Sequence, residues 1–183
     1  QDYDISAERG FLCKYCAASV NLEADLGEAR KTALALPKFL PSGEVRRLLL
    51  AGLPDSITQA DIAALSDAEA RMAMVHYSFM VQAFVWGEPE APSVLPRVLA
   101  LPITWLADRL GQPPLLPYSG YVLDNWDRFD AAGPIALDNI WMVQNFLSGM
   151  DEAWFVLIHV AIEARAGQVL AAFPSVIAAV GNE

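Results

Sequence analysis

One segment, residues 67–86, is apolar on nearly every side and dominates the hydrophobic pattern of the chain. Ser66 and Glu69 stand before it with the spacing of a capping box, in which serine accepts a bond from a free backbone N–H and glutamate reaches back. Gly87 follows the segment and is a common helix terminator. The pattern therefore predicts a central, buried helix over 67–86.

The remaining apolar positions predict further helices of unequal length. Their expected ranges are 44–53, 58–65, 103–110 and 118–129, with a long last helix from about Asp151 and Glu152 to about Phe173, just before Pro174. We expect residues 1–42 to be irregular and the four-proline stretch 88–102 to form a loop. The sequence shows no convincing strand pattern, so we predict an all-α fold.

Charge and apolar run lengths exclude two classes of partner. The net charge is −10 and the twelve basic residues are scattered, which argues against nucleic acid binding. The uncharged windows 72–87 and 166–182 are shorter than the roughly 18 to 20 apolar residues of a membrane span, so we expect no membrane partner. The polar start QDYDISAERG lacks a signal-peptide pattern, and two cysteines build no disulfide scaffold. We therefore expect a cytoplasmic protein.

Two motifs leave their chemistry open. Cys13 and Cys16 form a single C-x-x-C, which is redox-active, half of a metal site, or structural. Phe155, His159 and Glu163 share one face of the last helix. His159 is then a hydrogen-bonding group in a pocket, a metal ligand, or a satisfied core residue.

The other chemical candidates are ordinary core types. We interpret His76, within the predicted central helix, as structural. Tyr118, Tyr121 and Phe155 are suited to wall a flat ligand, but such aromatics equally fill a core. The sequence contains no G-x-S-x-G, no phosphate-binding glycine loop and no H-E-x-x-H. The residues alone thus predict a helical domain with a possible apolar pocket.

Several segments, taken in order, resemble the indoleamine 2,3-dioxygenase family. They are 3-YDISAERGFL-12, 36-LPKFLPSGEVR-46, 77-YSFMVQAFVWG-87, 95-LPRVLALP-102, 113-PPLLPYSGYVLDNW-126 and 151-DEAWFVLIHVAIEA-164. The resemblance implies a helical enzyme that uses haem b and O₂ to open the indole ring of L-tryptophan, giving N-formylkynurenine. It also implies a small N-terminal helical domain, here 1–110, followed by a linker and distal-pocket helices in 111–183.

The resemblance assigns roles to five residues. Tyr118, Tyr121 and Val122 match positions that enclose the indole on the distal side of the haem, where O₂ and substrate bind. Phe155 matches a phenylalanine that packs on the substrate ring, and Tyr118 and Phe155 would also border the haem. His159 matches the position beside the indole N–H, so it would act in catalysis as a neutral hydrogen-bond partner and not as an iron ligand.

The chain also departs from the family pattern. The haem-ligating histidine and the basic residue for the substrate carboxylate belong to a region beyond this chain, so we expect no metal ligand here. The chain would be the N-terminal portion of the enzyme and need a C-terminal domain or a second polypeptide. A fragment, a natural split and a degenerate relative all remain open.

Two further departures concern the N-terminal motif and the pocket. Residues 13-CKYC-16 replace a proline-containing stretch, and Tyr121 stands where several relatives have a smaller residue. The alternatives are therefore a haem enzyme of the same fold acting on a modified indole in secondary metabolism, or a non-catalytic helical binding module.

Overall fold

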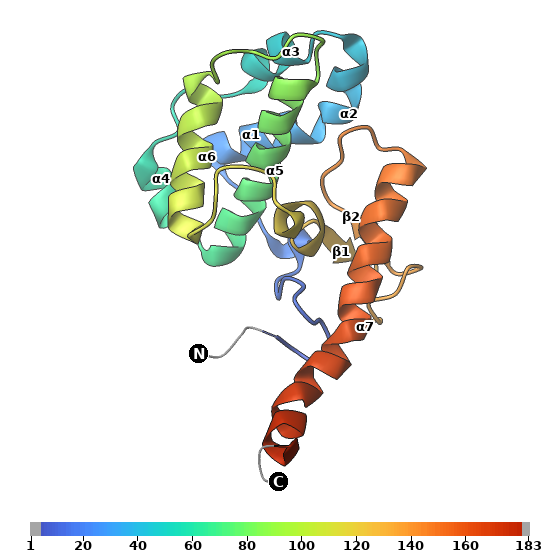
Figure 1. The fold of residues 1–183 in the computed structure, drawn as a ribbon. Helices are drawn as coiled ribbons and strands as arrows, with labels where there is room; N and C mark the ends of the chain where they lie inside the picture. Colours follow the sequence, from blue (N-terminus) through green and yellow to red (C-terminus); the bar gives the residue numbers. More distant parts are fainter. Residues whose placement is uncertain (1–4, 181–183) are drawn as a thin grey trace.

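The computed structural model describes residues 5–180; the first four and last three residues lie outside it. Most of the described chain is helical (Figure 1). The helices are α1 (Ala24–Leu34), α2 (Leu36–Phe39), α3 (Val45–Gly52), α4 (Gln59–Ala64), α5 (Asp67–Trp86), α6 (Arg97–Leu110) and α7 (Met150–Val180). Short turns are η1 (Ala17–Ser19), η2 (Leu40–Ser42) and the π-helical η3 (Ser119–Leu123), and two strands are β1 (Trp126–Arg128) and β2 (Ile140–Met142).

Helix α5 is the centre of the core, as the sequence predicted. It contacts α1, α3, α6 and η3. The Ser66 hydroxyl accepts from the backbone N–H of Glu69, and the Glu69 carboxylate accepts from the backbone N–H of Ser66, so the capping box is confirmed. The side chains of Tyr77 and Phe79 are completely or almost completely buried. Burial on all sides explains why this helix needs no polar face.

The short helices α3 and α4 are also confirmed, and α4 begins with a second capping box between Thr58 and Asp61. The irregular structure expected for residues 1–42 is wrong, because α1 and α2 lie there. Helix α1 buries mainly small residues, among them Ala29 and Ala33, against α5. Small buried residues give a weak hydrophobic period, so the pattern did not reveal this helix.

The loop expected over residues 88–102 is wrong from Arg97 onward, because α6 already begins there. Pro96 is its N-cap, and Pro102 lies inside the helix and is buried. An internal proline removes one backbone hydrogen bond, a cost that the packing of α6 on α5 and α4 offsets.

The segment 118–129, expected to be one helix, is a π-helical turn followed by a strand. Trp126 and Met142 pair in the antiparallel hairpin of β1 and β2. The side chain of Asn125 bonds both the backbone N–H and the carbonyl of Gln144, at 2.7 and 2.9 Å. The Asn125 side chain thus bonds the backbone of Gln144 in the way that a neighbouring strand would. This local alternative to helical hydrogen bonding ends the helix before Asn125. The fold is therefore mostly helical, as predicted, with a small sheet that the prediction missed.

Helix α7 continues past its predicted end at Phe173 and runs through Pro174. Its first half packs on η3 and β2 and buries Val156 and Val160. Beyond Gly167 no described residue of the helix is buried. Its C-terminal half extends away from the rest of the molecule (Figure 1). The carbonyl that Pro174 leaves without a helical partner lies in this largely exposed half and not in the core, where the loss would cost more.

By length and composition alone, α7 is able to cross a membrane, and within residues 5–180 no other helix meets that test. A helix that packs against a protein core meets the same test. The absence of a membrane partner therefore stays a prediction, and so does the division into 1–110 and 111–183.

Candidate functional site

Four of the five predicted site residues form one surface where η3 meets α7. The rings of Tyr121 and Phe155 lie with centroids 6.0 Å apart, and those of Tyr118 and His159 lie 6.1 Å apart, edge to face. Phe155 and His159 follow one another along α7 with ring centroids 4.5 Å apart and planes tilted by 44°. Tyr118 and Phe155 are each about half exposed. We call these four residues the aromatic surface.

The fifth predicted residue lies apart from this surface. Val122 belongs to η3, but its side chain is completely buried in the core. Its predicted contact with a substrate stays a prediction, and in this structure its visible effect is to anchor the turn that carries Tyr118 and Tyr121.

The spacing along α7 explains how the helix contributes to the surface. Phe155, His159 and Glu163 follow one another at four-residue steps and so share one face. Val156 and Val160, one position further along, are buried and fix the rotation of the helix. The predicted common face of Phe155 and His159 is therefore confirmed.

The ring of His159 has a defined hydrogen bond. Its Nδ1 lies 2.6 Å from the carbonyl oxygen of Phe155. Because a carbonyl only accepts, Nδ1 carries the proton in this arrangement, and a neutral ring then has Nε2 free as an acceptor. The arrangement thus assigns the tautomer that accepts a ligand N–H at Nε2.

Tyr118 is held by a second contact to α7. Its hydroxyl donates to Oε1 of Glu163 at 3.3 Å. Partial burial, together with the neighbouring Glu163 charge, raises the pKa of Tyr118. The phenol therefore remains protonated at neutral pH and keeps its hydrogen bond to Glu163.

Two phenylalanines that the sequence did not single out support Tyr121 from behind. Phe79 of α5 lies 5.5 Å from Tyr121, and Phe146 lies 4.4 Å from Phe79 between ring centroids. Phe79 sits in an evenly apolar helix, so no periodicity distinguishes it. The aromatic surface is consequently built on the central helix of the core.

The loop before α7 is fixed by Glu152. Its carboxylate accepts from the backbone N–H groups of Phe146 and Leu147, at 2.6 and 2.8 Å. Ser148 in the same loop has a φ of 56°, a conformation that non-glycine residues rarely adopt. The sequence identified Glu152 only as an acid near a helix N-terminus, whereas the structure shows that it positions Phe146.

Comparison with known proteins identifies what this arrangement belongs to. The family model for indoleamine 2,3-dioxygenase matches residues 1–183, the whole chain. The chain belongs to the indoleamine 2,3-dioxygenase family. It is 31% identical to indoleamine 2,3-dioxygenase 1 of Rattus norvegicus over 150 residues, a match that covers 81% of this chain and 36% of the rat protein.

Two fungal relatives give similar matches. The indoleamine 2,3-dioxygenase of Saccharomyces cerevisiae is 30% identical over 169 residues, covering 89% of this chain and 37% of the yeast protein. Indoleamine 2,3-dioxygenase nanC of Aspergillus nanangensis is 34% identical over 117 residues, covering 61% and 28%. The chain thus spans about a third of the length of the curated relatives it matches.

The second histidine of this family member lies in the core. The Nδ1 of His76 is 2.8 Å from Oε1 of Gln144, and its Nε2 has no partner among the described residues. Burial lowers the pKa of His76 to about 4, despite the opposing effect of the bond to Gln144. His76 is therefore neutral at physiological pH, in agreement with a structural interpretation.

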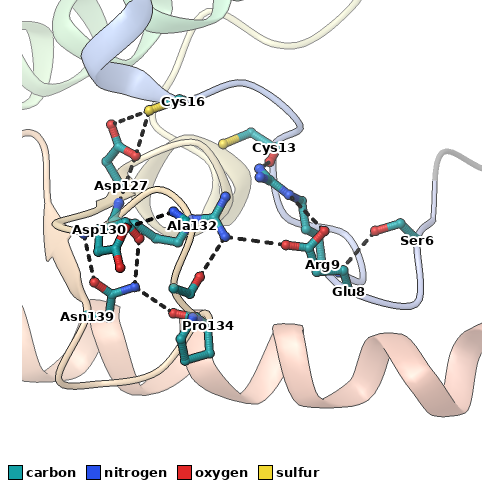
Figure 2. Close-up of polar contacts among 12 residues, drawn as sticks. Ser6, Glu8, Arg9, Cys13, Cys16, Asp127, Asp130, Ala132, Pro134 and Asn139 are labelled. Atoms are coloured by element: carbon teal, nitrogen blue, oxygen red, sulfur yellow. Dashed lines mark hydrogen bonds and ion pairs between the residues drawn. The ribbon is translucent and has the colours of Figure 1, made fainter.

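The C-x-x-C residues are free thiols with separate partners: the Cys13 thiol lies 3.7 Å from the carbonyl oxygen of Tyr15, and the Cys16 thiol contacts Asp127, as Figure 2 shows. The thiol of Cys16 donates to the carboxylate of Asp127, with distances of 3.1 and 3.2 Å to its two oxygens. Asp127 also accepts from the backbone N–H of Ala18 at 2.6 Å. Burial raises the pKa of Cys13 to about 12, which keeps that thiol protonated. Of the interpretations left open, these contacts favour a structural one.

The same N-terminal segment joins the hairpin to α7. Figure 2 shows Arg9 close to Cys13, whose carbonyl accepts from the Arg9 guanidinium. Glu8 pairs with Arg128 at 3.4 Å. Gly10 and Gly167 bring two backbones together, since a Cβ on Gly167 would lie 2.6 Å from the Gly10 nitrogen. Within residues 5–180 no group of three or more His, Cys, Asp and Glu side chains is able to hold a metal ion.

Proposed function

We propose that this chain forms the substrate-enclosing part of a haem-dependent dioxygenase that inserts O₂ into the indole ring of L-tryptophan to give N-formylkynurenine. Membership of the family supports this proposal. The observation that carries it for this chain is the half-exposed aromatic surface, which meets the requirement of a planar indole for flat apolar walls.

The haem contributes what these residues lack. When bound, it supplies the iron-centred activation of O₂, and the chain itself offers a partly exposed apolar border in Tyr118 and Phe155. This border fits one face of a flat macrocycle. We propose that the iron ligand and the basic partner of the substrate carboxylate come from outside residues 1–183.

Orientation of the indole is the proposed task of the chain. Phe155 and Tyr121 would form one apolar wall against the indole ring and exclude water from it, and Nε2 of His159 would accept the indole N–H. Holding the reacting ring in one pose removes much of the entropic barrier of a bimolecular step. The tautomer of His159, fixed through its bond to the Phe155 carbonyl, supports the acceptor role.

The remainder of the enzyme, whether a C-terminal domain or a second polypeptide, would cover the exposed face of α7. Five large apolar residues there are between 50% and 70% exposed: Val169, Phe173, Val176, Ile177 and Val180. A continuous apolar face of this kind marks an interaction surface. Cytoplasmic localisation is part of the same proposal.

The test is a visible absorption spectrum combined with turnover. The chain is expressed with the C-terminal two thirds of the yeast relative, reduced with dithionite and exposed to carbon monoxide. We expect a Soret band that shifts on forming the ferrous carbonyl complex, and consumption of L-tryptophan only when both parts are present. A complex that binds haem but turns over no L-tryptophan would contradict the proposed activity, and a complex that binds no haem would contradict the proposed cofactor.

The role of His159 is tested in the same complex. His159→Ala should raise KM or lower kcat for L-tryptophan while the Soret band persists. Loss of haem with the histidine would overturn the proposed role as substrate partner. Glu163→Gln is the matched control, because it changes a neighbour on the same face without removing the Nε2 acceptor.

A modified indole is the second candidate substrate, and the ring of Tyr121 is the observation that favours it. This phenol fills space between Phe79, Phe146 and Phe155 that a smaller residue would leave open. Tyr121→Ser should then change the preference between L-tryptophan and substituted indoles. Equal turnover ratios in the variant and the parent protein would remove this candidate.

A further inference from the structure

A cleft separate from the aromatic surface lies between residues 11–15 and the first two turns of α5. It is a cavity of about 490 Å³, within the size range of small-molecule sites. Its walls carry charges of both signs on Lys14, Asp67, Arg71 and Asp124, together with the ring of Phe11. The nearby pair of Asp67 and Arg109 is 3.3 Å apart, so Asp67 already has a cation.

The central pair of the cleft is Arg71 and Asp124. Nη1 of Arg71 lies 3.5 Å from Oδ2 of Asp124, which is a long separation for an ion pair. Asp124 is 7% exposed, whereas the side chain of Arg71 is about half exposed. The cation therefore keeps about half of its solvent contact, while the carboxylate is mostly desolvated.

This leaves the charge of Asp124 poorly compensated. Among the described residues its carboxylate has no hydrogen-bond donor besides Arg71. Burial raises the pKa of Asp124 although Arg71 acts to lower it. A buried carboxylate normally gathers several donors or a close cation. A further cation that entered the cleft would supply what the protein does not.

We propose that this cleft binds a free α-amino acid, with its ammonium group on Asp124, its carboxylate on Arg71 and an apolar side chain on Phe11. A ligand of one sign would satisfy one member of the pair and be repelled by the other. A zwitterion satisfies both, because its ammonium and carboxylate groups each meet a partner of opposite charge. Phe11 is about half exposed at the cleft and offers the apolar contact.

The cleft connects to the aromatic surface through the backbone. Asp124 directly follows η3, and the backbone N–H of Cys13 donates to the carbonyl of Leu123 at 3.1 Å. A ligand bound to Asp124 would therefore lie next to the turn that carries Tyr118 and Tyr121, and it would influence the position of that turn. The binding itself is independent of the function proposed above.

The experiment compares three ligands on the 183-residue chain by heteronuclear NMR titration. L-phenylalanine carries both charged groups, 3-phenylpropionate lacks the ammonium group, and 2-phenylethylamine lacks the carboxylate. We expect saturable shifts at residues 11–15 and at Arg71 with L-phenylalanine, and binding weaker by about tenfold or more for each of the others. Equal affinity for the three, or shifts confined to Tyr118 and Phe155, would overturn the proposal.

Two substitutions assign the charges. Arg71→Met should abolish the preference for L-phenylalanine over 2-phenylethylamine, and Asp124→Asn should abolish its preference over 3-phenylpropionate. Arg47→Met, at an exposed arginine outside the cleft, should leave all three affinities unchanged. If Asp124→Asn fails to fold, Arg71→Met alone tests the proposal, because the Arg71 side chain is half exposed and its removal leaves the core intact. An unchanged preference in that variant would contradict the proposal.

Discussion

Helices α5 and α7 are both long and apolar, yet they occupy opposite environments. Of the 20 residues of α5, most are buried, whereas α7 has 31 residues and buries only Val156, Val160, Ala164 and Gly167. The core closes around α5 from several sides, while the rest of the protein covers one side of α7, and only as far as Gly167. The composition of a helix therefore determines whether its surface must be buried against apolar residues. Only the tertiary contacts show whether those residues belong to this chain.

The largest expected difference is between two phenylalanines of these helices. Phe79→Ala on α5 should lower the free energy of unfolding by about 3–5 kcal/mol, because it leaves a cavity in a closed core. Phe173→Ala on α7 should change it by no more than about 0.5 kcal/mol, because that side chain is half exposed. Urea unfolding followed by circular dichroism measures both. Equal losses would show that α7 is covered within this chain, and the comparison would fail.

The two helices each carry one histidine, and these histidines should affect the pH dependence of the protein's stability differently. His76 on α5 has a folded-state pKa of about 4, below the ordinary 6.5, so the unfolded chain binds more protons between these values. The resulting destabilisation is absent above pH 6.5 and grows as pH falls toward 4, up to about 3 kcal/mol.

Substitution separates this effect from that of the carboxylates. His76→Gln should reduce the loss of stability between pH 7 and pH 4, as measured by urea midpoints at several pH values. His159→Gln on α7 is the control and should leave that loss nearly unchanged. If both variants retain the full pH dependence, His76 is not the group that takes up the proton.

Features of α5 and α7 that depend on neighbouring residues were predictable from the sequence, whereas those that depend on contacts between distant residues were not. The capping box at Ser66 and the stop at Gly87 are local, and they predicted α5 to the residue. The four-residue spacing predicted the shared face of Phe155 and His159. Helix α1 was missed because its contacts use small residues, and the hairpin because its three-residue strands depend on the side chain of Asn125 bonding Gln144, nineteen positions away.

The candidate site shows the same limit. Sequence spacing places residues on one helix face, but the rings behind Tyr121 come from α5 and from the loop before α7. Neither Phe79 nor Phe146 has a local feature that separates it from other core aromatics. Their role follows from packing between distant segments, which one sequence does not reveal.

A glycine tests where the packed half of α7 ends. Gly167→Ala should destabilise the protein by about 1–3 kcal/mol, because the new Cβ would lie within 2.9 Å of backbone atoms of Ser6, Ala7 and Gly10. Hydrogen exchange of the Gly10 amide, which bonds the carbonyl of Ser6 at 2.8 Å, should accelerate. Gly149→Ala is the matched control, since no atom lies within 4 Å of its added Cβ. An unchanged exchange rate at Gly10 would mean that packing against α7 does not stabilise the turn between Ser6 and Gly10.

The smallest expected effect concerns the start of α5. Ser66→Ala removes the side chain that accepts from the Glu69 backbone N–H, and it should lower the free energy of unfolding by about 1 kcal/mol. Ser66→Asp should retain most of the free energy of unfolding that Ser66→Ala loses, because an aspartate at this position accepts the same bond and interacts favourably with the helix dipole. Ser93→Ala, at an exposed serine outside the helices, should have no measurable effect in the same urea titrations. A loss near zero at Ser66 would mean that packing alone fixes the start of α5, and the local signal that predicted this helix would then contribute nothing to its stability.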